Sequence, residues 1–158
     1  MYSVNVTTLE AQPMLLLPWT GPYSEVEKGF ERLEEILAAA KLSAPEVEAI
    51  VGFYLDDPGQ TPPEEQRADL GVLLGEVSAA PEGMEARELA PGRYAVLTHK
   101  GGFASLMEAW CWLYDEWLPQ SGEVIDNDRL PFELYADSME PGIQPDDAEI
   151  LICAPLKG

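Results

Sequence analysis

Residues 21–37, GPYSEVEKGFERLEEIL, match residues 101–117, GGFASLMEAWCWLYDEW, at a constant offset of 80 residues and without a gap. In both stretches a turn containing glycine is followed by apolar side chains spaced three and four residues apart, which is the period of one helix face. The first helix presents Val26, Phe30, Leu33 and Leu37. The second presents Phe103, Met107, Trp110, Tyr114 and Trp117, and this stripe is widened by Leu106 and Leu113. The match predicts two copies of one supersecondary unit.

The same offset continues beyond the two helices. It pairs Leu55 with Tyr135, Asp57 with Asp137, Leu70 with Ile150 and Val72 with Ile152. β-Type patterns predict strands at residues 2–9, 14–17, 47–55 and 68–77, and again at residues 84–89, 93–99, 130–137 and 147–154. Turn residues at 18–22 are expected to end the second of these strands.

Isolated helices among runs of strands favour an α+β fold with an antiparallel sheet. We expect tandem duplicated strand–helix–strand–strand units within a single domain, residues 1–158, with repeat 1 at about 2–77 and repeat 2 at about 84–156. One copy alone buries too little apolar surface to be stable. The two copies, with two main helices, are therefore expected to pack around a central pocket.

The chain is strongly acidic, with 29 acidic against 9 basic residues and a formal net charge of −20. Such a charge repels phosphate backbones and excludes direct nucleic-acid binding, while it attracts cationic ligands or a basic protein surface. Most of the acidic residues are evenly spread, which also fits a role in solubility alone. No apolar run is long enough for a membrane span, and no secretory signal is visible, so a cytoplasmic location is expected.

No metal site or cofactor is expected from the sequence. His99 is the single histidine, and Cys111 and Cys153 are isolated, so no spacing of metal ligands is present. The two cysteines are expected to be free thiols. His99 is expected at the surface or in a turn, since no nucleophile lies beside it in the sequence.

Glu133 is the position where the repeat is broken in an informative way, because the 80-residue offset pairs it with Phe53. Alternation along a strand places Glu133 and Tyr135 on one face and Phe132 and Leu134 on the other. An apolar counterpart suggests a buried face, where a carboxylate needs a partner such as a cation held among aromatic rings. The alternative is an edge strand with a solvated Glu133, and the sequence leaves both interpretations open.

Aromatic side chains are expected to form the walls of a ligand site around Glu133. Rings beside a carboxylate bind flat or cationic organic molecules, with cation–π attraction of roughly 0.5–2 kcal/mol per ring. The candidate residues are Trp19, Phe53, Tyr54, Tyr94, Trp110 and Tyr135.

Three stretches carry a family resemblance. They are GPY…KGFERL (residues 21–33), GFYLDDP…TP…RAD (residues 52–69), and GRYAV (residues 92–96) with PFELY (residues 131–135). In these stretches the chain resembles the GyrI-like small-molecule-binding family, which includes the SbmC type of DNA gyrase inhibitory protein. The middle stretch is the most specific of the three, although Gln60 stands where an acidic residue is common.

The resemblance implies a fold of two strand–helix–strand–strand units around a central pocket. It also implies a ligand site, because related effector-binding domains of AraC- and MerR-type regulators use a glutamate on the strand matching Glu133 to meet cationic aromatic ligands. The chain has no helix-turn-helix segment, so we expect a stand-alone member. Such members are described as inhibitors of gyrase and as protecting against toxins.

Three functions follow as hypotheses. The first is a non-enzymatic protein that binds amphipathic, cationic aromatic molecules, for the sequestration or sensing of drugs and toxins. The second is inhibition of DNA gyrase as a protein partner. The third, alternative function is hydrolysis of electrophilic, cyclopropane-bearing cytotoxins, which the resemblance suggests and in which Glu133 would be the catalytic base.

Overall fold

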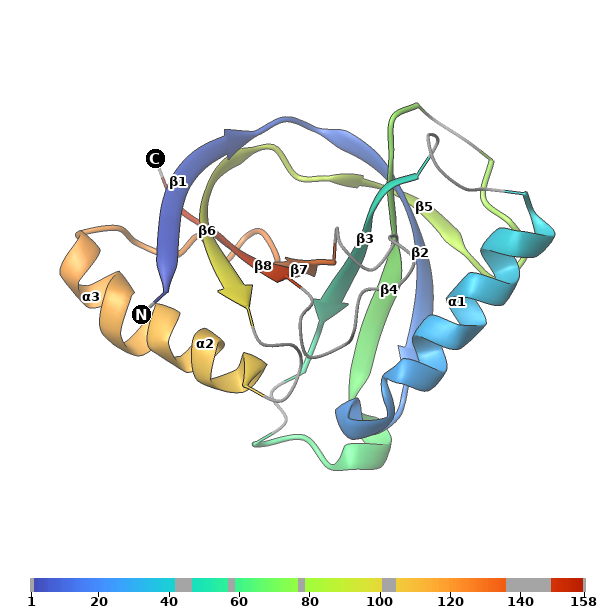
Figure 1. The fold of residues 1–158 in the computed structure, drawn as a ribbon, viewed down its shortest axis with the longest axis horizontal. Coiled ribbons are helices and arrows are strands. Elements are labelled where there is room, and N and C mark those ends of the chain that lie inside the picture. Colours follow the sequence, from blue (N-terminus) through green and yellow to red (C-terminus); the bar gives the residue numbers. More distant parts are fainter. Residues whose placement is uncertain are drawn as a thin grey trace. The chain divides into compact units, whose positions relative to one another are not determined.

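The computed structural model describes residues 2–41, 47–56, 59–76, 79–100, 105–135 and 149–157, and the statements below concern these residues. They fall into two units (Figure 1). We call Ala11–Leu89 the first-repeat unit, and Met1–Glu10 together with Ala90–Gly158 the second-repeat unit.

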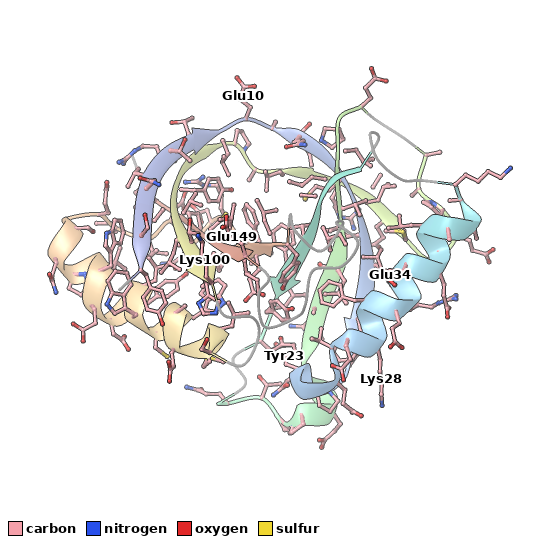
Figure 2. The ribbon with its side chains drawn as sticks, in the orientation of Figure 1. Glu10, Tyr23, Lys28, Glu34, Lys100 and Glu149 are labelled. Atoms are coloured by element: carbon pink, nitrogen blue, oxygen red, sulfur yellow. The ribbon has the colours of Figure 1, made fainter. Side chains whose placement is uncertain are left out.

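The first-repeat unit contains four strands and one main helix. Its elements are β2 (Gln12–Thr20), a 3₁₀ turn (Tyr23–Glu25), α1 (Glu27–Ala39), β3 (Val47–Tyr54), a second 3₁₀ turn (Pro63–Glu65), β4 (Arg67–Leu74) and β5 (Glu85–Leu89). The strands pair antiparallel in the order β3-β4-β2-β5. The outer surface of α1 is polar, and Lys28 and Glu34 are exposed on it (Figure 2).

The second-repeat unit repeats this plan. Its elements are β1 (Ser3–Leu9), β6 (Gly92–Lys100), α2 (Leu106–Trp112), a π-helical turn (Leu113–Trp117), α3 (Leu118–Ser121), β7 (Phe132–Leu134) and β8 (Glu149–Pro155). The strands pair antiparallel in the order β1-β6-β8-β7. The α+β class and the duplicated strand–helix–strand–strand order are therefore confirmed.

The first strand of each repeat pairs in the unit formed by the other repeat. Strand β1 lies beside β6 with Leu9 opposite Gly92, and β5 lies beside β2 with Leu89 opposite Gln12. These two pairings have the same register when the chain is shifted by 80 residues. Strands β2 and β6 also begin and end at equivalent positions, so the offset found in the sequence holds here.

Strand β2 extends as far as Thr20, into the turn that was expected at residues 18–22. Pro18 is exposed within the strand, opposite Asp69 of β4. Strand β5 pairs with β2 only from Gln12 to Leu16, so Pro18 lies beyond that pairing. Proline is tolerated where a strand has a free edge, because its missing N–H then breaks no ladder hydrogen bond.

The helices bury a narrower face than their aromatic residues indicate. Helix α1 buries Gly29, Leu33, Ile36 and Leu37, which confirms part of the predicted stripe. In the second helix the buried residues are Leu106, Ala109 and Leu113, whereas Met107 is 57% exposed. The predicted burial of Leu106 and Leu113 is confirmed, whereas the prediction for Met107 was wrong, because large side chains gather beside the buried face. Phe103 lies outside the described residues.

The second helix continues past Pro119, although a proline inside a helix usually interrupts it. Pro119 lies in the first turn of α3, where a missing N–H costs little. The π-helical turn precedes it, and the N–H of Leu118 reaches back to the carbonyl of Leu113. The helical segment then ends at Ser121, where Gly122 adopts a left-handed conformation with φ of 79°.

Candidate functional site

Glu133 lies on the face of the second-repeat sheet that carries α2. Directly paired residues of antiparallel strands share a face, and the pairings run from Leu97 on β6 to Ile152 on β8 and to Glu133 on β7. Leu97 and Ile152 are fully buried, and Glu133 is 3% exposed. Of the two interpretations left open by the sequence, the buried one is confirmed.

Two aromatic donors hold the Glu133 carboxylate. The indole Nε1 of Trp110 on α2 donates to Oε2 at 2.5 Å, and the hydroxyl of Tyr135 donates to Oε1 in a short hydrogen bond. Tyr135 is itself 3% exposed, while Trp110 is only partly buried. Within the described part of the chain, each carboxylate oxygen thus has one neutral hydrogen-bond donor.

Burial sets the proton affinity of this carboxylate. It raises the pKa of Glu133 from 4.5 to about 7, while the hydrogen bonds from Tyr135 and Trp110 act in the opposite direction by stabilising the anion. None of the ion pairs found among the described residues includes Glu133. In its unit these pairs join Arg93 to Glu123, Lys100 to Glu149 and Arg129 to Asp126.

Trp110 is held in turn by a stacked ring. The rings of Trp110 and Tyr114 are nearly parallel, at an interplanar angle of 8° and a centroid distance of 5.9 Å. Burial raises the pKa of Tyr114 to about 12, so its ring stays neutral. Tyr114 belongs to the π-helical turn, and π-helical insertions are frequent at functional sites. Both residues fall on the helix stripe expected from the sequence, where i,i+4 spacing predicts neighbouring side chains without predicting a parallel stack.

The Glu133 cluster, which we define as Glu133, Tyr135, Trp110 and Tyr114, has two chemical capacities. An ionised carboxylate among rings neutralises an organic cation. A carboxyl group with a pKa near neutrality also takes up and releases protons, as a general base must.

Tyr94 lies on the opposite face of the same sheet. Its ring packs edge-on against Phe132 at 5.4 Å, and Phe132 alternates with Glu133 along β7. The Tyr94 hydroxyl donates to the carbonyl of Ala90 at 2.7 Å, and the Arg129 guanidinium lies 4.8 Å from the ring centroid. The structure therefore does not bring Tyr94 to the carboxylate of Glu133.

Three of the predicted wall residues belong to the first-repeat unit. Phe53 on β3 is buried opposite Asp69, and Tyr54 packs edge-on against Tyr23 at 5.1 Å. The ring of Trp19 lies beside Gly29 of α1, where an added Cβ would come within 3.0 Å of it. Each of these rings has neighbours within its own unit.

The strand register corrects the counterpart of Glu133. In the first-repeat unit Leu17 pairs with Leu70, and Leu70 pairs with Gly52. In the second, Leu97 pairs with Ile152, and Ile152 pairs with Glu133. Because β2 and β6 are equivalent at an offset of 80 residues, Glu133 corresponds to Gly52 rather than to Phe53. The carboxylate is thus present in one repeat at a position that has no side chain in the other. By the same register Ile152 corresponds to Leu70 rather than to Val72, so the offset predicted from the sequence does not hold on β4 and β8.

His99 is buried, which corrects the expectation of a surface or turn position. It is 1% exposed on β6, and its Nε2 lies 3.3 Å from the Ser105 hydroxyl. Its ring also lies near that of Tyr2, at a centroid distance of 6.0 Å. His99 shares a strand face with Leu97 and Ala95, which are both buried, and this two-residue spacing is the signal that could have placed it.

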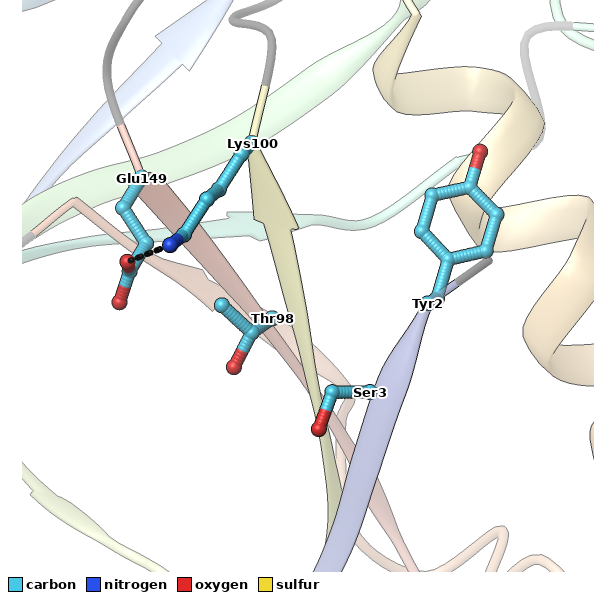
Figure 3. A pocket seen from close by; sticks show the side chains of 5 residues that line it. All are labelled: Tyr2, Ser3, Thr98, Lys100 and Glu149. Carbon is cyan, nitrogen blue, oxygen red and sulfur yellow. Dashed lines mark ion pairs between the residues drawn. The ribbon is translucent and has the colours of Figure 1, made fainter.

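A separate open hollow of about 630 Å³ lies at the end of β6 (Figure 3). It is lined by Tyr2, Ser3, Thr98, Lys100 and Glu149, and Lys100 pairs with Glu149 at 3.9 Å. Thr98 and Lys100 alternate with Leu97 and His99, so their side chains leave the strand on the face opposite Glu133. This hollow is therefore distinct from the Glu133 cluster.

Neither a metal cluster nor a disulfide occurs in the described part of the chain. No group of three or more His, Cys, Asp or Glu side chains in this part of the chain is arranged to hold a metal ion. Cys111 is exposed and Cys153 is buried, and both are free thiols. No helix within the described ranges has the length and apolar character needed to cross a membrane.

The whole chain matches a known family of ligand-binding domains. The model of the GyrI-like small-molecule-binding domain matches residues 2–157, and the chain belongs to this family.

A curated relative and two solved structures agree with this assignment. The chain is 33% identical over 115 residues to the DNA gyrase inhibitor of Pectobacterium carotovorum subsp. carotovorum (strain PC1), covering 68% of this chain and 71% of that protein. The EcmrR C-terminal domain superposes with a TM-score of 0.79 at 14% identity, covering 99% of this chain and 98% of that domain. SAV2435, solved bound to tetraphenylphosphonium, has a TM-score of 0.66 at 16% identity, covering 99% and 94%. At these identities the two structures establish a shared fold.

Proposed function

We propose that this protein binds amphipathic, cationic aromatic small molecules, and that the Glu133 cluster supplies the negative charge and the rings. Sequestration or sensing of a drug or toxin is the role that such binding serves. The observation that carries the proposal is a carboxylate buried between two aromatic donors, with no ion-pair partner among the described residues.

Two further observations support the proposal. The family is one of small-molecule-binding domains, and a protein of the same fold was solved with the aromatic cation tetraphenylphosphonium. A buried carboxylate is costly unless its charge is compensated, so a cation that reaches it gains more than it would from an exposed acid. The net charge of −20 also raises the local concentration of cations around the protein.

The direct test is titration with tetraphenylphosphonium at about pH 8, followed by calorimetry and tryptophan fluorescence. Glu133→Gln keeps the shape of the side chain and removes its charge, and we expect a loss of affinity of about 10–100-fold. Glu108→Gln is the matched control, because Glu108 is an exposed acid on the same helix. Equal affinities in wild type and Glu133→Gln would reject the role of this carboxylate.

Inhibition of DNA gyrase is a second candidate function, favoured by the charge. A surface with a net charge of −20 is suited to cover a basic DNA-binding surface on an enzyme, and a curated relative is named a DNA gyrase inhibitor. The cytoplasmic location expected from the sequence is where such a partner is found. A supercoiling assay should show inhibition that weakens steeply as salt is added, and no inhibition at any protein concentration would reject it.

Hydrolysis of an electrophilic toxin is the alternative activity, favoured by the proton affinity of Glu133. A carboxyl group with a pKa of about 7, hydrogen-bonded to a tyrosine hydroxyl, is able to accept a proton from an attacking water. Product formation that disappears in Glu133→Gln would support hydrolysis. Saturable binding with no product would favour the binding function instead.

A further inference from the structure

Among the described residues, the neighbours of the Glu133 carboxylate supply dipoles and no charge. Strand β8 places apolar Ile152 opposite Glu133, and Tyr135, directly after β7, adds its hydroxyl. Helix α2 and the π-helical turn add the Trp110 indole and the Tyr114 ring that stacks on it. His99 is on the same sheet face, but it pairs with Ile150 on β8, two residues from Ile152, which is the residue that pairs with Glu133.

In the described part of this unit, the ion pairs of basic side chains are all with acidic residues other than Glu133. Arg129 pairs with Asp126 and also donates to the carbonyl of Leu156, Arg93 pairs with Glu123, and Lys100 reaches Glu149. An anion buried among neutral dipoles has two ways to lose its desolvation cost: it takes up a proton or it gains a cation. The two ways exclude each other at one carboxyl group.

We propose that an organic cation bound at Glu133 replaces a proton there, so that uptake of the ligand releases a proton and acidification releases the ligand. This inference rests on the proposed binding function and adds to it a direction of regulation.

The exchange also narrows the ligand class. The ligand must stay positively charged at the pH where Glu133 loses its proton, which favours permanent cations such as quaternary phosphonium or ammonium compounds. Amines of pKa well above 7 qualify as well. A neutral aromatic molecule gains nothing from the ionised carboxylate, so its affinity should not follow the charge of Glu133.

The size of the effect follows from the ionisation of this carboxyl group. With a pKa of about 7, the ionised fraction grows about tenfold between pH 6 and pH 8, and the affinity for a permanent cation should grow by about the same factor. Near pH 6, where the free protein is mostly protonated at this group, each cation bound should release about one proton.

The experiment uses the full chain and tetraphenylphosphonium, in calorimetric titrations from about pH 5.5 to pH 8.5. Each titration is repeated in two buffers of different ionisation enthalpy, because the difference in observed heat counts the protons released. Glu133→Gln should bind weakly, with an affinity independent of pH and with no proton release. N-phenyl-1-naphthylamine, a neutral aromatic dye, should bind equally at both ends of the range.

The outcomes separate this inference from the function on which it rests. Affinity that is flat with pH in the wild type, without proton release, would overturn the exchange and leave the binding function standing. The same pH dependence in Glu133→Gln would also overturn it, and would assign the proton to another group such as His99. Absence of binding at every pH would reject the binding function itself, and the exchange with it.

Discussion

The Glu133→Gln variant should be more stable than wild type at alkaline pH and slightly less stable than wild type at acidic pH. The pKa of Glu133 is about 7 in the folded chain and 4.5 in the unfolded reference. Between these two values the folded state holds a proton that the unfolded state has released, so the free energy of unfolding of the wild type falls as the pH rises. Glutamine carries no proton to lose, and this contribution is absent from the variant.

The magnitude follows from the difference between the two pKa values. It corresponds to about 3 kcal/mol of wild-type stability, present below about pH 4.5 and lost above about pH 7. At acidic pH the variant should be slightly less stable than wild type, by about 1 kcal/mol, because its amide group cannot accept hydrogen bonds from both Trp110 and Tyr135. Above neutral pH the order should reverse.

Urea unfolding of both proteins, followed by circular dichroism at half-unit steps from about pH 5 to pH 8, measures the difference directly. Other titrating groups contribute equally to both chains and cancel in the subtraction. Glu116→Gln, at an exposed position in the π-helical turn, is the control and should differ from wild type by less than about 0.5 kcal/mol throughout. A difference between wild type and Glu133→Gln that stays constant over this range would refute the reasoning.

Three other perturbations test separate features of the structure. Gly71→Ala should lower the free energy of unfolding by more than about 3 kcal/mol, because a Cβ there would overlap a carbonyl oxygen of the neighbouring strand. Gly83→Ala is the comparison: a Cβ there meets open space, so the free energy of unfolding should fall by only about 1 kcal/mol, for the backbone φ of 92° alone. Both are measured by urea unfolding, and equal costs would contradict the strand packing. Trp110→Phe removes one stabilising donor from the carboxylate, so the midpoint of the pH-dependent stability should move up by roughly 0.5–1 pH unit, and a downward shift would contradict this role. Cys111 should react with a thiol reagent in the folded protein and Cys153 only after unfolding, because Cys153 is buried and burial raises its pKa to about 12; two fast reactions would contradict this burial.

Much of the fold could be predicted because the repeat and the hydrophobic period indicate the same elements. Strands β2 and β6 share their bounds at the predicted offset, and Leu33 and Leu37 lie on the buried face of α1 as the helical spacing indicates. The burial of Glu133 was inferred from an apolar counterpart, and the burial is correct although the counterpart is Gly52 instead of Phe53. Either residue marks a position without a charged side chain in the first repeat.

The rest could not be predicted because the 80-residue offset does not determine which residues pair between neighbouring strands. A shift of one residue moves a side chain to the other face of a sheet, and the register around β3 and β7 differs by one residue from the offset that fits β2 and β6. The helical spacing places Trp110 and Tyr114 on one stripe, as i,i+4 neighbours, but it does not predict that their rings stack parallel across the end of α2 and the π-helical turn. His99 was predicted at the surface or in a turn because no nucleophile lies beside it in the sequence, whereas its two-residue spacing from the buried Leu97 and Ala95 decides its position.

The exchange of β1 and β5 means that neither repeat contains the outer strand of its own unit. A single repeat made as a free polypeptide would complete this four-stranded arrangement only by exchanging its first strand with a second copy. The product of such an exchange is a domain-swapped homodimer. The present chain has the topology of such a dimer with its two subunits joined by a peptide tether. The tether frees the subunits from being identical, which is how one of them has an acidic side chain at a position where the other has only a hydrogen atom.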